Sequence, residues 1–477
     1  MRKLSIKLIS AVLVCLTLLF AVSVCAMAEE KIPEMPVFDL PCELKTVKVG
    51  LCFGSSAVST AGFQSSSGGF DVGFFDFSRN FHKLGNIADG GISACSGSNA
   101  WYILLNNSYG SFSEAASAAT SVGGFPAYID YQYRALIGPF GSSEDAKEAI
   151  GKKGCGGSPY IGSDNAILVA SSDYGKSIFM YDCAGRYLAV YPNEGSASLD
   201  GNSYSGAFEL SRKSNCVCVT NYVGLEDYVK GVLPYEVSAD WPAEALKSQA
   251  VCARTYAYNS INTYVDRGFD VRNDTYSQVY KGNSYSGGVI GDAVDATAHK
   301  FVRYGGAVCR VYYMSSDGGG TEDGINVFGE RRAYLKAVAD TFEVASDFYG
   351  KSWHEEFTPL ELTYLLNDAG FTIGEVTDVK ATYSDMGNVI RLDFADADGN
   401  TAFFERLECY SLMGLNSIRY DVSTEVNDDG DTTYVFDGCG WGHNCGMSQW
   451  GACSMANNGK ISCGDIIKFY FSGAYIA

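Results

Sequence analysis

Short alternating runs of apolar and polar residues occupy most of the chain, and this pattern predicts strands. Residues 46–54, TVKVGLCFG, alternate in this way, and Ser- and Gly-rich turns follow to about residue 73. From about residue 158 the pattern is again mostly that of strands, separated by Gly, Asn and Ser. Strands are expected at residues 166–170, 177–181, 187–191, 206–210, 216–221, 307–314, 335–339, 389–394 and 433–436.

Strand-like and helix-like segments alternate between these two parts. Strands are expected at residues 101–105, 125–131 and 133–137, and a Gly138-Pro139 turn follows the third. A helix is expected at residues 111–122 with Ser111 or Ser113 as its N-cap, and a second from Ser142, where acids follow the serine. This β-α-β-β-α order indicates a small α+β unit, which a simple spacer module would also satisfy.

A helical segment at residues 231–264 interrupts the second β-rich part. It begins GVLPYEVSADWPAEALKSQAVCARTY, with Pro242 at the start of an alanine-rich helix and Asp240 as a candidate cap. Lys247 and Arg254 are seven residues apart, so they share a helix face to within about 20°. They are expected to reach a groove beside Glu236, although a solvated stripe with Lys247 near Glu244 would fit the same spacing.

Glu236 is the candidate for acid–base chemistry. Apolar neighbours such as Val232, Leu233 and Trp241 favour a raised pKa, and an acid that protonates a glycosidic oxygen near neutral pH needs one. On residue chemistry alone, a lone glutamate before a helix is more often a solvated charge. Ordinary glycoside hydrolysis uses two carboxylates, whereas one suffices when the sugar supplies its own nucleophile.

A second cluster, GWGHNCGMSQWGA at residues 440–452, brings His443, Ser448 and Gln449 among closely spaced glycines. Glycine permits close backbone approach and positive φ, which suits the wall of a substrate groove. A lone histidine is more often structural than catalytic.

These two clusters together resemble the SpoIID/LytB family, over about residues 204–477 with a weaker match at 46–73. The resemblance implies a mostly β catalytic domain with a few helices, at residues 160–477, that cuts bacterial cell-wall glycan. It implies Glu236 as the catalytic acid, then base. The substrate-binding residues that it implies are Lys247, Gln249, Arg254, Ser315, Ser316, Tyr334, Lys336, His443, Ser448 and Gln449.

The small α+β unit, placed at residues 97–155, resembles a SPOR domain, with Gly-Phe-Pro before its second strand and Gly-Pro-Phe after its third. The resemblance implies a ferredoxin-like fold that binds peptide-stripped glycan. Residues 45–95 are expected to form an N-terminal β segment, and the overall class is α+β.

A zinc site occurs in some members of the family at a Tyr-His-Ser-Ser segment. Here the segment reads YYMSSDGGGT, with Met314 in place of the histidine and Asp317 at a ligand-like position. Cys309 alone cannot complete a site that needs about four ligands, so no metal or other cofactor is expected.

The chain ends and the charge limit location and partners. Residues 1–28 match an export signal, with Arg2, Lys3 and Lys7 before an apolar run and Ala-Met-Ala before the acids; an uncleaved anchor is the alternative. Losing these three cations changes the formal charge from −20 to −23, which disfavours nucleic acid and anionic lipid. The sixteen cysteines leave disulfide pairing open.

The combined prediction is a secreted, wall-located lytic transglycosylase that cleaves MurNAc-GlcNAc bonds of peptide-stripped strands with 1,6-anhydro-MurNAc formation. The alternative is a non-catalytic LytB-like modifier that binds glycan and enhances a partner N-acetylmuramoyl-L-alanine amidase. A membrane contact is expected only through an uncleaved signal.

Overall fold

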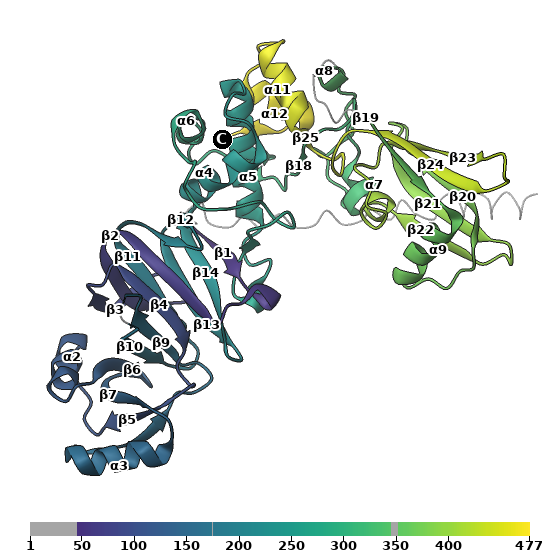
Figure 1. Ribbon diagram of the computed structural model, residues 1–477. Helices are drawn as coiled ribbons and strands as arrows, with labels where there is room; N and C mark the ends of the chain where they lie inside the picture. The colour runs from purple at the N-terminus through teal and green to yellow at the C-terminus, as the bar shows by residue number, and fades with distance from the viewer. Residues whose placement is uncertain (1–44, 174, 345–351) are drawn as a thin grey trace, which may run out of the picture.

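The computed structural model describes residues 45–173, 175–344 and 352–477, and it has an α+β fold in which strands predominate (Figure 1). This confirms the predicted fold class. The export signal predicted at residues 1–28 lies outside the described residues. Within the described residues, we find no helix whose length and apolar character would let it cross a membrane.

A long mixed sheet carries the N-terminal half of the chain. Its strands follow the order β15-β1-β14-β13-β11-β2-β4-β9-β10, with β3 and β12 at its side. Strands from residues 46–96 thus pair with strands from residues 167–224 and share one core with them. The strands are β1 (Thr46–Cys52), β2 (Thr60–Phe75), β3 (Phe81–Ile87), β4 (Gly91–Ser96), β9 (Ile167–Ser171), β10 (Ser177–Asp182), β11 (Leu188–Leu199), β12 (Asn202–Ser205), β13 (Ala207–Lys213), β14 (Cys216–Gly224) and β15 (Val271–Arg272).

The predicted α+β unit extends this sheet at one end, where β6 pairs with β10 in parallel (Figure 1). Its strands follow the antiparallel order β6-β7-β5-β8, which is the ferredoxin-like arrangement. Ser111 and Ser142 cap the two helices by accepting N–H bonds from their first turns. The elements are β5 (Trp101–Leu105), α2 (Phe112–Ser121), β6 (Phe125–Ile129), β7 (Gln132–Phe140), α3 (Ser143–Lys153) and β8 (Gly157–Ile161).

Gly138 and Pro139 lie inside β7, so the turn predicted there is wrong. The partner strand β5 changes register between Trp101 and Ile103, opposite this dipeptide. Such an irregularity relieves the ladder of a hydrogen bond that proline cannot donate.

A helical layer lies beyond the other end of the sheet and carries the two sequence clusters (Figure 1). The helix α5 is buried along most of its length, between α4, α6, α11 and α12. It begins at Ala243, with Pro242 in the N-cap position and no side chain capping it, so Asp240 does not serve as the expected cap. The helices are α4 (Leu225–Glu236), α5 (Ala243–Asn259), α6 (Gly288–Ala296), α11 (Gln449–Asn457) and α12 (Cys463–Tyr470).

A separate core joins two three-stranded antiparallel sheets in residues 352–439. A capping box formed by Thr358 and Glu361 starts its helix α9. The elements are β19 (Ser352–Phe357), α9 (Pro359–Asp368), β20 (Val376–Tyr383), β21 (Val389–Asp396), β22 (Thr401–Glu405), α10 (Glu408–Ser411), β23 (Tyr420–Val426) and β24 (Thr432–Cys439).

Short elements connect these parts, and they correct two predicted strands. Residues 307–314 form two separate two-residue strands, and residues 335–339 form only an isolated bridge at Ala339. The short elements are η1 (Gly54–Ser56), η2 (Val265–Arg267), β16 (Val302–Tyr304), β17 (Ala307–Val308), β18 (Tyr313–Met314), α7 (Gly324–Phe328), α8 (Thr341–Val344), β25 (Met447–Ser448) and β26 (Tyr475–Ile476). Every cysteine that the structure describes is a free thiol.

Candidate active site

Glu236 is the last residue of α4 and stands at the wall of a groove. The helix ends there because Val237 adopts an extended conformation and starts the connection to α5. The groove encloses about 730 Å³. In the described chain, Glu236 carries the single carboxylate among the groove's lining residues.

Residues of the C-terminal cluster line the same groove. Tyr313 and Met314 of β18 pair in parallel with Met447 and Ser448 of β25. This pairing brings Gln449, the first residue of α11, to the carboxylate: its Nε2 donates to Oε2 of Glu236 over 3.2 Å. Two residues 213 positions apart in the sequence therefore meet in one site.

Two further donors hold the Glu236 side chain: the Tyr313 hydroxyl and the backbone N–H of Val279. Gln278 fixes Tyr313, because its Nε2 donates to the tyrosine oxygen over 2.8 Å while its Oε1 accepts from Tyr228 over 3.0 Å. The carboxyl group is thus pre-oriented by a connected polar network.

Burial raises the pKa of Glu236 above the usual value of a glutamic acid. The hydrogen bonds from Gln449, Tyr313 and Val279 oppose this effect, since they favour the charged form, but burial is the larger influence. A carboxyl group of this kind retains its proton to higher pH than a solvated glutamate, as a general acid requires.

His443 lines the same groove as a neutral side chain. Burial lowers its pKa to about 4, so it carries no charge near neutral pH. Its Nδ1 accepts the backbone N–H of Cys445 over 3.1 Å, and its ring packs edge-on against Phe328 and Tyr312. A second hydrogen bond joins the ring to the backbone of Tyr313, so the fold holds the imidazole in place.

Aromatic side chains form much of the groove wall, and the sequence analysis did not identify them. Tyr276 is 75% exposed and Trp441 is 48% exposed, so both present ring surface to solvent. Their signal was the density of aromatic residues in TYSQVY, outside the two clusters, and the tryptophan of GWGH, inside the second cluster. The aromatic lining residues are Tyr235, Tyr256, Tyr276, Tyr312, Tyr313, Phe328, Tyr410 and Trp441.

Ser315, His443 and Gln449 are the predicted binding residues that the structure brings to the groove with Glu236. Ser316 and Ser448 lie behind its wall instead. Both are fully buried, and their hydroxyls donate to the two oxygens of Glu343 over 2.6 Å each.

Arg254 is not brought to the groove, contrary to expectation. Its side chain is completely buried and forms an ion pair with Glu226 of α4 over 2.6 Å. It also donates to the backbone oxygens of Val294 and Lys300. The spacing placed Arg254 on one face of α5 correctly, but that face is covered by α4 and α6.

The other predicted binding residues also lie outside the groove lining. Lys247 pairs with Glu244 over 2.7 Å, as the alternative interpretation of the stripe anticipated. Gln249 is buried within α5, and Lys336 pairs with Asp323 over 2.8 Å. The buried Tyr334 accepts the backbone N–H of Arg310 through its hydroxyl.

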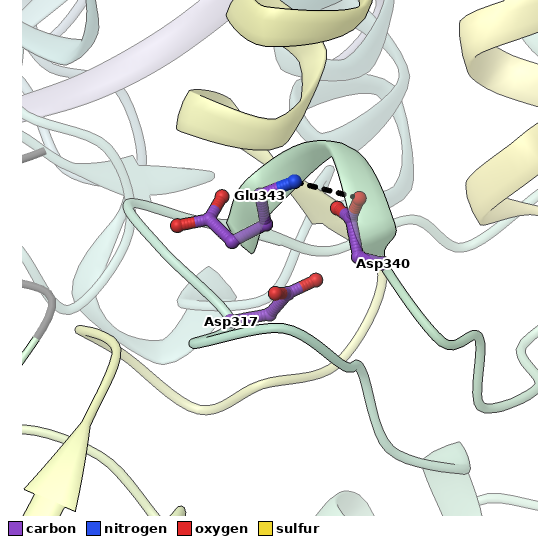
Figure 2. A group of neighbouring side chains, drawn as sticks. All are labelled: Asp317, Asp340 and Glu343. Atoms are coloured by element: carbon purple, nitrogen blue, oxygen red, sulfur yellow. Dashed lines mark hydrogen bonds between the residues drawn. The ribbon is translucent and has the colours of Figure 1, made fainter. Parts of the chain in front are cut away.

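Among the residues that the structure describes, the histidine and cysteine donors that a zinc site needs do not cluster near Met314. The Cys309 thiol is buried, and burial raises its pKa to about 12, which opposes the thiolate that zinc binds. Within the described residues, one group of candidate ligands clusters, and it consists of the carboxylates of Asp317, Asp340 and Glu343 (Figure 2).

Comparisons with known proteins identify a family and several relatives with similar sequences. The family model described as SpoIID, Stage II sporulation protein, matches residues 213–304, which contain α4, α5 and Glu236. The chain is 31% identical over 273 residues to the Stage II sporulation protein D of Bacillus subtilis, covering 54% of this chain and 75% of that protein. The chain belongs to the SpoIID family.

Two further relatives are similar to this chain over comparable lengths. An uncharacterised protein of Brachyspira hyodysenteriae is 34% identical over 294 residues, covering 60% of this chain and 76% of the relative. A Bacillus subtilis protein named amidase enhancer is 29% identical over 336 residues, covering 61% of this chain and 46% of the relative.

Proposed function

We propose that the protein is an exported lytic transglycosylase that cleaves MurNAc-GlcNAc bonds of peptide-stripped peptidoglycan and leaves 1,6-anhydro-MurNAc ends. Membership of the SpoIID family and the similarity to an amidase enhancer support a role at the bacterial cell wall. The observation that carries the proposal is Glu236, a carboxyl group of raised pKa held by three donors in a groove with aromatic walls.

One carboxyl group suffices for this reaction. Glu236 donates its proton to the glycosidic oxygen as the bond from that oxygen to C1 of the muramyl sugar breaks. The resulting carboxylate then accepts the proton of the 6-hydroxyl of the same sugar, whose oxygen forms the new bond to C1. Glu236 returns to its protonated state, and no water is consumed.

The groove supplies binding for a neutral sugar chain. Exposed rings such as Tyr276 and Trp441 offer flat apolar surfaces, while Ser315, Gln278 and the neutral His443 offer hydrogen bonds. Donors that already hold the carboxylate, Gln449 and Tyr313, keep it oriented through both proton transfers.

Digestion of peptide-stripped glycan tests the proposal directly. The products are separated and weighed, because an anhydro end is lighter than a hydrolysed end by one water. Anhydro-muramyl products support transglycosylation, and products with reducing muramyl ends would show hydrolysis instead. Binding without any product would favour the second candidate function.

That second candidate is a non-catalytic modifier that binds glycan and enhances an N-acetylmuramoyl-L-alanine amidase. The similarity to a protein named amidase enhancer favours it. A partner amidase assayed with and without this protein on intact peptidoglycan separates the two: a modifier raises peptide release even when Glu236 is replaced by glutamine.

The ferredoxin-like unit is proposed to bind peptide-stripped glycan, as its resemblance to SPOR domains implies. Its two ends meet, because a Cβ built on Gly162 would lie 2.7 Å from the backbone oxygen of Gly97. Residues 98–161 can therefore be excised by joining these glycines. We expect the shortened protein to sediment less with stripped glycan, while it still cuts short soluble strands; unchanged sedimentation would contradict the proposed binding role.

The pH profile of cleavage should reflect the raised pKa of Glu236. Activity requires the protonated acid, so the rate falls as pH rises through this pKa, at a higher pH than an ordinary glutamate would give. Gln449→Leu removes a donor that favours the carboxylate, so it should move this falling limb to still higher pH. A shift in the opposite direction, in a variant of unchanged melting temperature, would contradict the assignment.

A further inference from the structure

Three carboxylates gather behind the groove wall, away from the proposed chemistry of Glu236. Asp317 follows β18, Asp340 precedes α8, and Glu343 lies within α8 (Figure 2). One oxygen from each lies within 4.8 Å of the others, and all three side chains are buried. Burying three acids together is costly unless something neutralises them.

The hydrogen bonds of Asp340 and Glu343 come from the fold. Asp340 accepts the backbone N–H groups of Phe342 and Glu343, at 3.0 Å each, and the hydroxyl of Tyr470. Glu343 accepts one serine hydroxyl on each oxygen, as described above. These bonds orient both carboxylates but bring no positive charge.

Asp317 has one side-chain oxygen that no hydrogen-bond donor reaches. Its side chain has no solvent exposure, and its Oδ1 accepts the N–H of Gly319 over 2.8 Å. Its Oδ2 is buried with no hydrogen-bond partner. Figure 2 shows this carboxylate directed toward the turn that carries Asp340 and Glu343. A buried carboxylate oxygen without a donor calls for a proton or a cation.

The Lys and Arg side chains that the structure describes form no ion pair with these three carboxylates. In the described part of the chain, the ion pairs formed by Lys and Arg side chains use other carboxylates. The site therefore favours an added positive charge.

We propose that Asp317, Asp340 and Glu343 bind a hard divalent cation, with Ca²⁺ preferred. All three supply oxygen, which Ca²⁺ and Mg²⁺ favour, whereas structural zinc prefers sulfur and nitrogen. Calcium–oxygen distances are about 2.4 Å, so oxygens on opposite sides of the ion are about 5 Å apart. The cluster, whose oxygens lie within 4.8 Å of one another, can surround such an ion, and three buried carboxylates suit Ca²⁺ because Mg²⁺ usually keeps several waters and binds through one or two carboxylates.

The cation would brace the wall that positions Glu236. Glu343 holds Ser448, and the next residue, Gln449, donates to Glu236. Glu343 also holds Ser316, whose backbone exchanges two hydrogen bonds with Trp441 of the groove. Asp317, Asp340 and Glu343 are thus positioning residues for the groove.

Metal analysis and thermal melting of the whole exported chain test the site without reference to cleavage. Wild-type protein purified with CaCl₂ should carry about one calcium per chain, and a chelator should remove it. Adding Ca²⁺ at about 100 times its Kd should then raise the melting temperature by roughly 3 °C, with a smaller rise for Mg²⁺.

Asp317→Asn keeps the shape of the side chain and removes its charge, so it should abolish the calcium content and the calcium-dependent rise. The matched control Asp429→Asn, at an exposed turn, should keep both. Wild-type protein that holds neither ion and melts at the same temperature in Ca²⁺, Mg²⁺ and chelator would overturn the proposal. That result would mean that the three carboxylates share a proton instead of binding a cation. The conclusion would not depend on whether Asp317→Asn folds or whether the protein cuts glycan.

Discussion

Glu236→Gln protein should bind peptide-stripped glycan as the wild type does and release no anhydro-muramyl ends. Glutamine keeps the size of the side chain and its contacts with Gln449 and Tyr313, but it can neither donate the acid proton nor accept one from the 6-hydroxyl. General acid–base catalysis contributes about 10²–10⁴-fold. Because one residue serves both steps, we expect a loss at the upper end of that range.

The measurement is the rate of anhydro-end formation by mass, paired with sedimentation on the same glycan. Glu425→Gln, at an exposed position of β23, is the matched control and should cut at the wild-type rate. Cleavage retained by Glu236→Gln protein would remove this residue from the acid role. Loss of binding together with cleavage would instead indicate that the carboxylate holds substrate.

The sequence predicted the local features of this fold well, because short-range rules determine them. The serine caps at Ser111 and Ser142 and the strand pattern around residues 167–221 follow from turn chemistry and alternation alone. The Gly138-Pro139 dipeptide was mispredicted because a neighbouring strand, not the dipeptide, determines whether proline fits in a sheet.

The site was only partly predictable, because contacts between distant segments of the chain assemble it. The motif resemblance indicated that Glu236 and the cluster at residues 440–452 belong together, and the structure joins them through Gln449. Spacing on a helix shows which residues share a face, but not what covers it. The carboxylate cluster behind the groove was missed because Asp317 and Asp340 come from segments that only the folded chain brings into contact.

Arg254 illustrates the difference between sharing a helix face and lining a groove. Its replacement should reduce stability more than activity. Arg254→Met leaves Glu226 without its guanidinium partner and the backbone oxygen of Lys300 without a donor. Removing one member of a buried pair costs about 3–5 kcal/mol. Glu226 is 23% exposed and regains some hydration, so we expect the lower end, about 3 kcal/mol, or a fall of roughly 3 °C in melting temperature.

Lys247→Met is the matched control on the same helix. Its partner Glu244 is a partly exposed neighbour one turn away, and such pairs contribute about 0–1 kcal/mol. The melting temperature of this variant should therefore stay within roughly 1 °C of the wild type. Adding Glu226→Gln to Arg254→Met should restore part of the lost stability, because the unpaired carboxylate is then gone. If Arg254→Met instead melted normally and failed to cut glycan, the arginine would act at the groove. Its charge would then not be needed to stabilise the packing of α5 against α4 and α6.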